Sequence, residues 1–378
     1  MEPDPKALEY YRTGQSNYTW QELAEMSLWA SGCTADSIQT NMARINQAVE
    51  TMLNLGDFPS VRKERAEYIL TYLHRNILQS YSMYQTGIDA IFINGRYNCV
   101  SSAVLYAIFC KAAGIDTTAV ITRDHSFITV HIDGENIDVE TTNRYGFDPG
   151  NRREFQDQFG RVTGFSYVPP QNYRERQNIN LIELVSLILN NRISEHERQG
   201  RFAEAVPLAV DRAALLLGNS PVPSETIPRN ALFKDPYGDL LDRIFNYGAV
   251  LLRNSREEEG IQWVITASLK YPVNEAERLQ EYYHAAINNR ISRFLRARQI
   301  TEGRDFLESQ KYLLTDVNYA QLDTVLLDAR AADYHNRFAA EWNRRNYEEA
   351  ERILNEGLTE FPDNRQLLNN KARVENRR

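Results

Sequence analysis

The 378-residue sequence has only three cysteines, no dense run of positive charge and no long hydrophobic stretch. The cysteines, Cys33, Cys99 and Cys110, are odd in number and widely spaced, which argues against a disulfide framework and against paired zinc ligands. The longest apolar runs, such as residues 181–189, fall short of the roughly 20 residues that cross a bilayer. We therefore expect at least one free thiol and no transmembrane segment.

Charge and composition narrow the class of protein further. The net charge is -8 and no segment gathers the lysine and arginine that a phosphate backbone requires, so nucleic acid is not an expected partner. Hydrophobic residues at 42% and charged residues at 25% are typical of a globular protein of two or three folding units. No signal sequence is evident, which predicts a cytoplasmic protein, or a periplasmic or exported one if Met1 replaces a removed signal peptide.

The first part of the chain predicts packing helices. Apolar residues recur at helical spacing over residues 19–32, 34–55 and 60–78. Thr19 is a suitable N-cap for the first of these helices, and Gly56 closes the second. These helices are expected to cover a core rather than to carry chemistry.

The pattern then changes to a helix followed by strands. A strongly apolar helix is predicted from Cys99 to Ala113. Two β-rich runs follow at 117–122 and 126–132, and the dipeptide Asp133-Gly134 before residues 136–141 is a strong hairpin signal.

Cys99 is the candidate nucleophile of this region. Asn98 is a good N-cap, which places Cys99 in the first turn of a buried helix, where the helix dipole favours the thiolate. The unpaired N–H groups there can also stabilise an oxyanion. The alternative interpretation is a small buried hydrophobe, which we assign to Cys33 and Cys110.

The hairpin turn predicts which residues accompany the thiol. A two-residue turn at Asp133-Gly134 places His125, at the start of one strand, diagonally opposite Glu140 on the next. His125 could then act as the base and Glu140 could orient it, whereas Asp138 lies one step too far away and faces Thr129. The alternative interpretations are that His125 is an ordinary surface histidine and that Glu140 is a solvated strand carboxylate. The register itself pairs Ile132 with Glu135, Val130 with Ile137 and Ile128 with Val139.

This region resembles the transglutaminase-like superfamily of papain-like folds over roughly residues 60–145. The resemblance is carried by Tyr97-Asn98-Cys99, Ala103, Leu105, residues 112–115, Asp124-His125-Ser126-Phe127 and residues 132–142. It implies a catalytic cysteine at Cys99, a histidine at His125 and the acid at Glu140. The sequence departs from the family pattern in having glutamate as the acid and Thr141 where the family has proline.

The rest of the chain predicts helical repeats. Residues 144–178 lack periodicity and are rich in glycine and proline, so we expect an irregular connection there. Beyond it the segments resemble degenerate tetratricopeptide repeats. Small residues and prolines carry this resemblance, at Gly248, Gly260, Ala267, Pro272, Ala350, Gly357 and Pro362, with further units near Gly200 and Gly303.

The sequence thus predicts an α+β papain-like, transglutaminase-like core followed by an all-α, tetratricopeptide-like domain. The expected parts are N-terminal helices at 1–59, the thiol domain at 60–150, a connection at 151–178 and helical repeats at 179–378. The expected function is thiol-dependent hydrolysis of an amide in a peptide or protein, with a protein partner on the repeats and no cofactor or metal. The alternative is a catalytically silent scaffold. Asn94 and Asn98 are candidate oxyanion donors, and Asp138 is the alternative acid.

Overall fold

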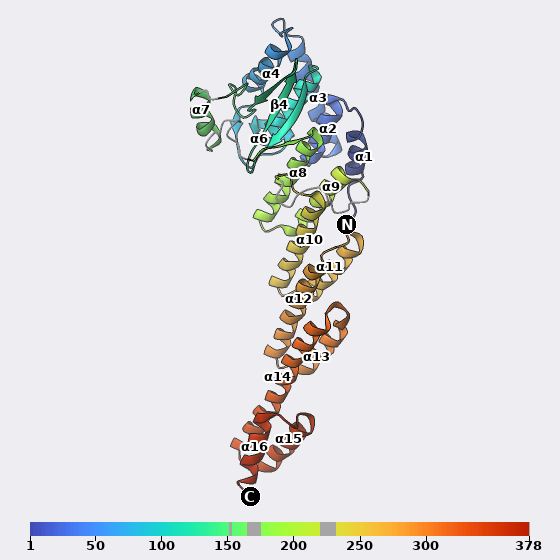
Figure 1. Ribbon diagram of the computed structural model, residues 1–378, viewed down its shortest axis with the longest axis vertical. Coiled ribbons are helices and arrows are strands. Elements are labelled where there is room, and N and C mark those ends of the chain that lie inside the picture. Colours follow the sequence, from blue (N-terminus) through green and yellow to red (C-terminus); the bar gives the residue numbers. More distant parts are fainter. Residues whose placement is uncertain (151–152, 165–174, 220–231, 378) are drawn as a thin grey trace. The chain divides into compact units, whose positions relative to one another are not determined.

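The computed structural model describes residues 1–150, 153–164, 175–219 and 232–377. Over these residues the protein is mostly helical, with a four-stranded antiparallel sheet and a two-stranded parallel ladder, so the fold class is α+β. The chain divides into two compact units, Met1–Tyr247 and Gly248–Arg378 (Figure 1).

Four helices open the first unit, and three of them follow the predicted segments closely. Thr19 caps the second of these helices and accepts from Glu22 N–H, while the Glu22 carboxylate accepts from the N–H of Thr19. The helix before it was not predicted. The four helices are α1 (Pro5–Gly14), α2 (Trp20–Ala30), α3 (Ala35–Leu53) and α4 (Arg62–Asn76).

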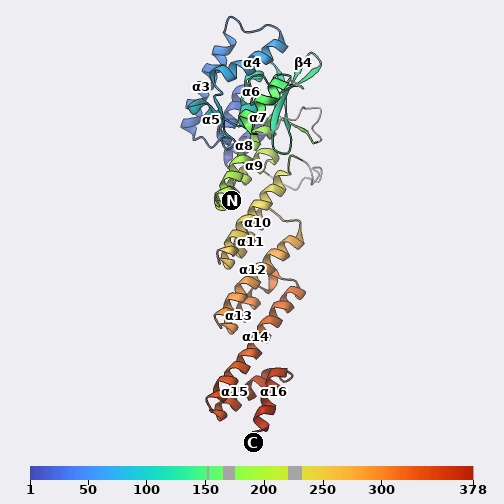
Figure 2. The same cartoon turned by 90° about the vertical axis from the view of Figure 1, so that its left-hand side faces the viewer.

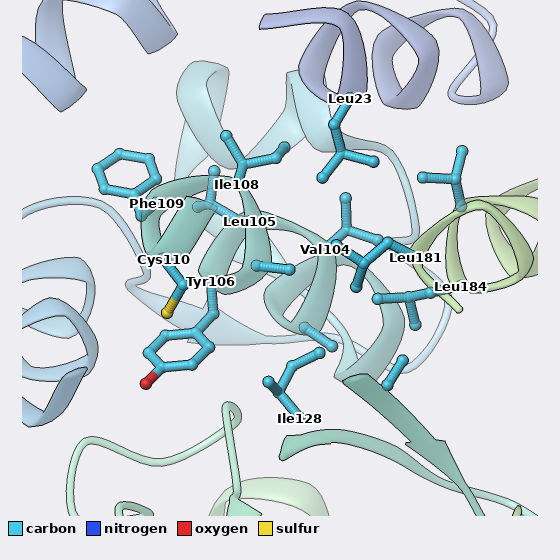
Figure 3. Close-up of a cluster of buried hydrophobic side chains, with 14 of the residues drawn as sticks. Leu23, Val104, Leu105, Tyr106, Ile108, Phe109, Cys110, Ile128, Leu181 and Leu184 are labelled. Atoms are coloured by element: carbon cyan, nitrogen blue, oxygen red, sulfur yellow. The ribbon is translucent and has the colours of Figure 1, made fainter. Parts of the chain in front are cut away.

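Helix α6 (Cys99–Ala112) lies at the centre of the first unit. It packs against α2, α4 and the sheet, and the short α5 (Ile88–Asn94) precedes it. Every residue from Ser101 to Cys110 is buried, because apolar side chains occupy all sides of the helix. Figure 3 shows Leu105, Ile108 and neighbouring residues of α6 within this core. A helix packed on all sides holds its first residue in a fixed place.

The sheet has the strand order β5-β4-β3-β6, with all neighbours antiparallel. Asp133 and Gly134 have φ values of 51° and 86°, which suits a tight hairpin turn of the predicted kind. The predicted pairing of Ile132 with Glu135 and of Ile128 with Val139 is confirmed. The strands are β3 (Asp116–Ile121), β4 (Ser126–Ile132), β5 (Glu135–Val139) and β6 (Gln177–Ile179).

A second, shorter ladder flanks the start of α6. Strand β1 (Ser80–Tyr81) pairs in parallel with β2 (Arg96–Tyr97), so that Tyr81 lies beside Tyr97. The Ser82 N–H donates to the carbonyl of Tyr97 over 2.8 Å. This ladder was not predicted, and it brings a segment from before α5 next to the residues that lead into α6.

The boundary between the units differs from the one predicted at 151–178. That stretch contains α7 (Arg153–Thr163) and the start of β6, and its residues 151–152 and 165–174 lie outside the described residues. The next helices, α8 (Leu181–Arg198) and α9 (Phe202–Leu217), belong to the first unit. Helix α8 packs on α2 and α6, and α9 packs on α8 and α1. Figure 2 shows α8 and α9 next to each other. Their apolar faces add to the core around α6, which is why both helices belong to the first unit.

The second unit consists of helices in which each packs against the next in the chain. Helix α10 (Pro236–Arg253) contains the division between the units. The helices that follow are α11 (Glu257–Lys270), α12 (Ala276–Arg296), α13 (Ile300–Ser309), α14 (Asp316–Asn343), α15 (Tyr347–Glu360) and α16 (Arg365–Glu375).

Small residues lie where these helices approach most closely. A Cβ added at Gly248 or at Gly260 would lie 2.7 or 2.8 Å from the hydroxyl of Tyr282. One added at Gly357 would lie 3.0 Å from Cβ of Tyr334. Ala350 is fully buried. Glycine and alanine are thus needed for close helix packing at these positions. In the described part of the chain, no helix is both long enough and apolar enough to cross a membrane.

Candidate active site

The first turn of α6 presents Cys99. Asn98 caps the helix by accepting from Ser101 N–H at 2.9 Å, and Ser101 Oγ accepts from the N–H of Asn98, also at 2.9 Å. The cysteine is partly exposed, whereas Cys110 in the same helix is buried. Because Cys99 and Val100 are the first residues of the helix, their N–H groups have no carbonyl partner within it.

His125 and Glu140 lie together beside this thiol. Nε2 of His125 lies 2.6 Å from Oε2 of Glu140, and the two side chains are 9% and 3% exposed. The other ring nitrogen, Nδ1, is left to interact with Cys99, to which the imidazole is hydrogen-bonded. The structure therefore brings the predicted cysteine, histidine and glutamate into one chain of contacts.

The second oxygen of Glu140 is also occupied. Oε1 accepts from the hydroxyl of Thr142 at 2.7 Å and from its N–H at 3.1 Å. The main chain of Glu140 is fixed as well, since its N–H donates to the carbonyl of Gly146 over 2.8 Å. A carboxylate held at both oxygens can orient an imidazole without moving itself. Glutamate is thus accommodated at the position where the resembled family has aspartate.

The electrostatics of the trio favour an ion pair. Burial raises the pKa of Cys99, but the hydrogen bond and the charge of His125, together with Ser126, lower that pKa below its ordinary value. Burial lowers the pKa of His125, and the Glu140 carboxylate and Cys99 outweigh this effect and raise the pKa well above its ordinary value. Burial raises the pKa of both other thiols, Cys33 and Cys110. Cys99 is therefore the thiol best suited to react as a thiolate.

A neutral histidine and two tyrosines support the loop that carries the acid. His74 donates from Nε2 to the carbonyl of Thr141 over 3.0 Å, and burial lowers the pKa of His74 to about 4. The hydroxyl of Tyr97 donates to the carbonyl of Thr142 over 3.1 Å. Tyr81 packs edge-on against Tyr97, and burial and then the charge of Cys99 raise the pKa of Tyr81. A phenol with a raised pKa stays protonated and remains a hydrogen-bond donor near the thiol.

Aromatic rings cover the imidazole. Phe159 of α7 meets His125 edge-on at 5.5 Å between ring centroids, and Phe127 stacks beside it at 6.5 Å. Both phenylalanines are buried. These rings exclude water from the contact between His125 and Glu140 and thereby strengthen it.

The remaining candidates from the sequence have other partners. The Asp138 carboxylate accepts from Thr129 Oγ1 at 2.6 Å and forms an ion pair with Arg176, away from His125. Asn98 uses its side-chain oxygen as the helix cap and its amide N–H to contact the carbonyl of Met83 at 3.3 Å. Asn94 is exposed and accepts from the N–H of Arg96 at 3.0 Å. The structure does not bring these three residues into the contacts of the thiol.

Several residues of the site were missed by the sequence analysis. Thr142, His74 and Tyr81 contact the acid, its loop or the surroundings of the thiol. Thr142 follows the acid by two residues, a spacing at which a hydroxyl can reach back to the carboxylate, so this signal was present. His74 and Tyr81 precede the thiol by many residues, and only the folded chain places them here. No group of three or more histidine, cysteine, aspartate and glutamate side chains suited to a metal occurs among the described residues.

Comparisons with known proteins give little further information. No family model matches the chain, and no curated protein matches it. Among solved structures, the chain is similar to menin, in a crystal structure that reveals the binding site for the Mixed Lineage Leukemia protein. The sequence identity is 15%, the match covers 88% of this chain and 91% of that one, and the TM-score is 0.35. A similarity at this level supports no conclusion about the site.

Proposed function

We propose that the protein is a thiol-dependent acyl-transfer enzyme that hydrolyses an amide bond in a peptide or protein. The observation that carries the proposal is the contact of His125 with Glu140 at 2.6 Å, next to a thiol whose pKa the histidine lowers. Nucleophile, base and orienting acid in hydrogen-bond contact are the arrangement that activates a cysteine.

The first half of the reaction uses the ion pair directly. The thiolate of Cys99 attacks the carbonyl carbon, a C–S bond forms, and negative charge develops on the carbonyl oxygen. In this proposal the N–H groups of the first turn of α6 donate to that oxygen. The imidazolium of His125 gives its proton to the amine as the C–N bond breaks, which leaves a thioester and a neutral histidine.

The second half reverses the roles. His125 takes a proton from water, whose oxygen attacks the thioester carbon, and the C–S bond breaks. The carboxylic acid leaves, and the proton that His125 took from water stays on its ring, so that the thiolate and the imidazolium are restored. Glu140 keeps the ring oriented throughout because both of its oxygens are held. Water is proposed as the acceptor because it is the default one, and no cofactor takes part.

The fold around the trio supports a transglutaminase-like assignment of this unit. The cysteine begins a buried helix, the histidine directly precedes a strand of an antiparallel sheet, and the acid directly follows the next strand. This is the order that the sequence resemblance implied. The glutamate is the main departure from that family, and its two bound oxygens argue that the substitution is tolerated here.

A partner-binding role is proposed for the second unit. Its consecutive packed helices, with glycine or alanine at the closest approaches, support a tetratricopeptide-like array. Such arrays bind peptides or protein ends on their surfaces. If the thiol is silent, this binding would be the whole function, which is the alternative to the enzyme.

The test is covalent capture of the thiol. The protein is incubated with an electrophilic amide probe, and intact mass is compared between the wild type and Cys99→Ala, with Cys33→Ala as the matched control. We expect one adduct in the wild type and in Cys33→Ala, and none in Cys99→Ala. An adduct that persists in Cys99→Ala, or no adduct at all, would favour the scaffold.

A further inference from the structure

The hydroxyl of Ser126 is buried without a regular hydrogen bond. Ser126 is 2% exposed, and its Oγ has no hydrogen-bond partner among the described residues. A buried hydroxyl without a partner destabilises a fold, so its presence needs an explanation. Ser126 directly follows His125 and is the first residue of β4.

The backbone N–H of Ser126 is also free of the sheet. Thr122 N–H donates to the carbonyl of His125 over 2.9 Å, which makes these two residues a hydrogen-bonded pair of the β3–β4 ladder. The next pair, Ile121 and Ser126, is then a non-hydrogen-bonded pair, in which the N–H points away from β3. On the other side, the ladder with β5 ends at Ile128.

The side chain of Ser126 points towards α6. Side chains alternate along a strand, so Ser126 shares a face with Ile128 and Val130, whereas His125 lies on the opposite face. Ile128 and Val130 are fully buried in the core built around α6. Figure 3 shows Ile128 in this cluster. The residue of α6 that Ser126 affects is Cys99, because the hydroxyl and the N–H of Ser126 both lower the pKa of that thiol.

We propose that Ser126 is a further residue of the active site, whose hydroxyl and N–H bind the thiolate form of Cys99. A neutral thiol is a weak acceptor, so the hydroxyl lacks a good partner until the sulfur is charged. The same two donors would stabilise the thiolate when it is released from the thioester as the C–S bond breaks. This inference rests on the proposed function and deepens it, since it assigns a role to the residue next to the base.

The experiment measures the thiol directly. The pH titration of the Cys99 thiolate is followed by ultraviolet absorbance, with the matching Cys99→Ala protein subtracted, in the wild type, Ser126→Ala and Ser27→Ala. Ser27 is a fully buried serine of α2 whose hydroxyl donates to the carbonyl of Leu23 over 2.6 Å, and it supplies the matched control. Alkylation rates and thermal unfolding are recorded on the same proteins.

We expect Ser126→Ala to raise the pKa of the Cys99 thiol by about one unit, which leaves about tenfold less thiolate at a pH below that pKa. Its unfolding temperature should be unchanged or higher, because no partner of the hydroxyl is left unsatisfied. Ser27→Ala should leave the thiol titration unchanged. An unchanged thiol pKa in Ser126→Ala, or a clearly lower unfolding temperature, would overturn the inference.

The titration separates this inference from the proposed function. If the wild-type thiol titrates low and Ser126→Ala raises its pKa, but the amide probe is never attacked, the inference stands and the enzyme proposal fails. If the probe is attacked and Ser126→Ala titrates like the wild type, the enzyme proposal stands and the role of Ser126 is wrong.

Discussion

Glu140 contacts His125 through one carboxylate oxygen at 2.6 Å and the hydroxyl of Thr142 through the other at 2.7 Å. The acid therefore has no unused oxygen and no freedom to turn away from the imidazole. This contact distinguishes Glu140 from Asp138, whose carboxylate is bound by Thr129 of the same hairpin and by Arg176, which precedes β6.

Replacing Glu140 should lower the reactivity of the Cys99 thiol but leave the thiol in place. We expect Glu140→Gln to slow Cys99 alkylation by roughly tenfold or more, because an amide orients and stabilises the imidazolium less well. Asp138→Asn is the matched control and should leave alkylation nearly unchanged. The rate of Cys99 alkylation across a pH series checks both variants, with circular dichroism to verify folding. The opposite ranking would mean that Glu140 is not the acid of the site.

Gly146 should be needed for the position of the acid. A Cβ added there would lie 1.9 Å from the carbonyl oxygen of Glu140, a contact that the main chain must move to relieve. We expect Gly146→Ala to destabilise the fold by about 1–3 kcal/mol and to slow alkylation of Cys99. At Gly56 an added Cβ meets nothing within 4 Å, so Gly56→Ala is the control and should change neither property. Urea unfolding and labelling rates measure the two effects, and equal behaviour of the variants would contradict the expectation.

His74 should make stability depend on pH in a defined window. Its pKa is about 4 in the folded protein, against 6.5 for an ordinary histidine, because burial disfavours the charged ring. Between these values the unfolded chain binds a proton that the folded chain does not, so stability is full above pH 6.5 and falls as the pH drops towards 4. The shift corresponds to a loss of about 3 kcal/mol.

The variant His74→Gln isolates this effect. Glutamine does not titrate but can still donate to the carbonyl of Thr141, so the variant should show a flatter pH dependence of the free energy of unfolding in that window. His125 is present in both proteins, and its contribution cancels in the difference. Parallel pH profiles for the two proteins would show that His74 is not the group responsible.

Truncation should distinguish the observed boundary from the predicted one. A fragment of residues 1–178 lacks α8 and α9, whose buried residues include Leu184, Val185 and Ile188. Burial of each such side chain contributes about 1.5–3 kcal/mol to the free energy of unfolding. The summed loss for the two helices is therefore comparable to the whole stability of an ordinary domain. We expect 1–178 to show no cooperative thermal transition, and 1–254, which retains α8, α9 and all of α10, to unfold cooperatively and keep a reactive Cys99. Cooperative unfolding of the 1–178 fragment would support the boundary predicted from the sequence instead.

The sequence by itself determined the local parts of the site. The turn at Asp133-Gly134 sets the hairpin register, because a two-residue loop with positive φ angles allows few alternatives. Asn98 sets the start of α6, because a cap acts on the residues that directly follow it. These two signals together placed Cys99, His125 and Glu140 on elements that could meet.

Only the tertiary structure decided what surrounds them. Strand β6 pairs with β3 from far along the chain, and α8 and α9 pack into the core of the first unit rather than that of the second. The hydrophobic effect is non-directional, so the apolar periodicity of a helix predicts that one face is buried but not which element covers it. The same holds for His74 and Tyr81, which reach the site from earlier segments. The orientation of Ser126 towards Cys99 depends on where the ladder with β5 stops, a property of the folded sheet that no residue type encodes alone.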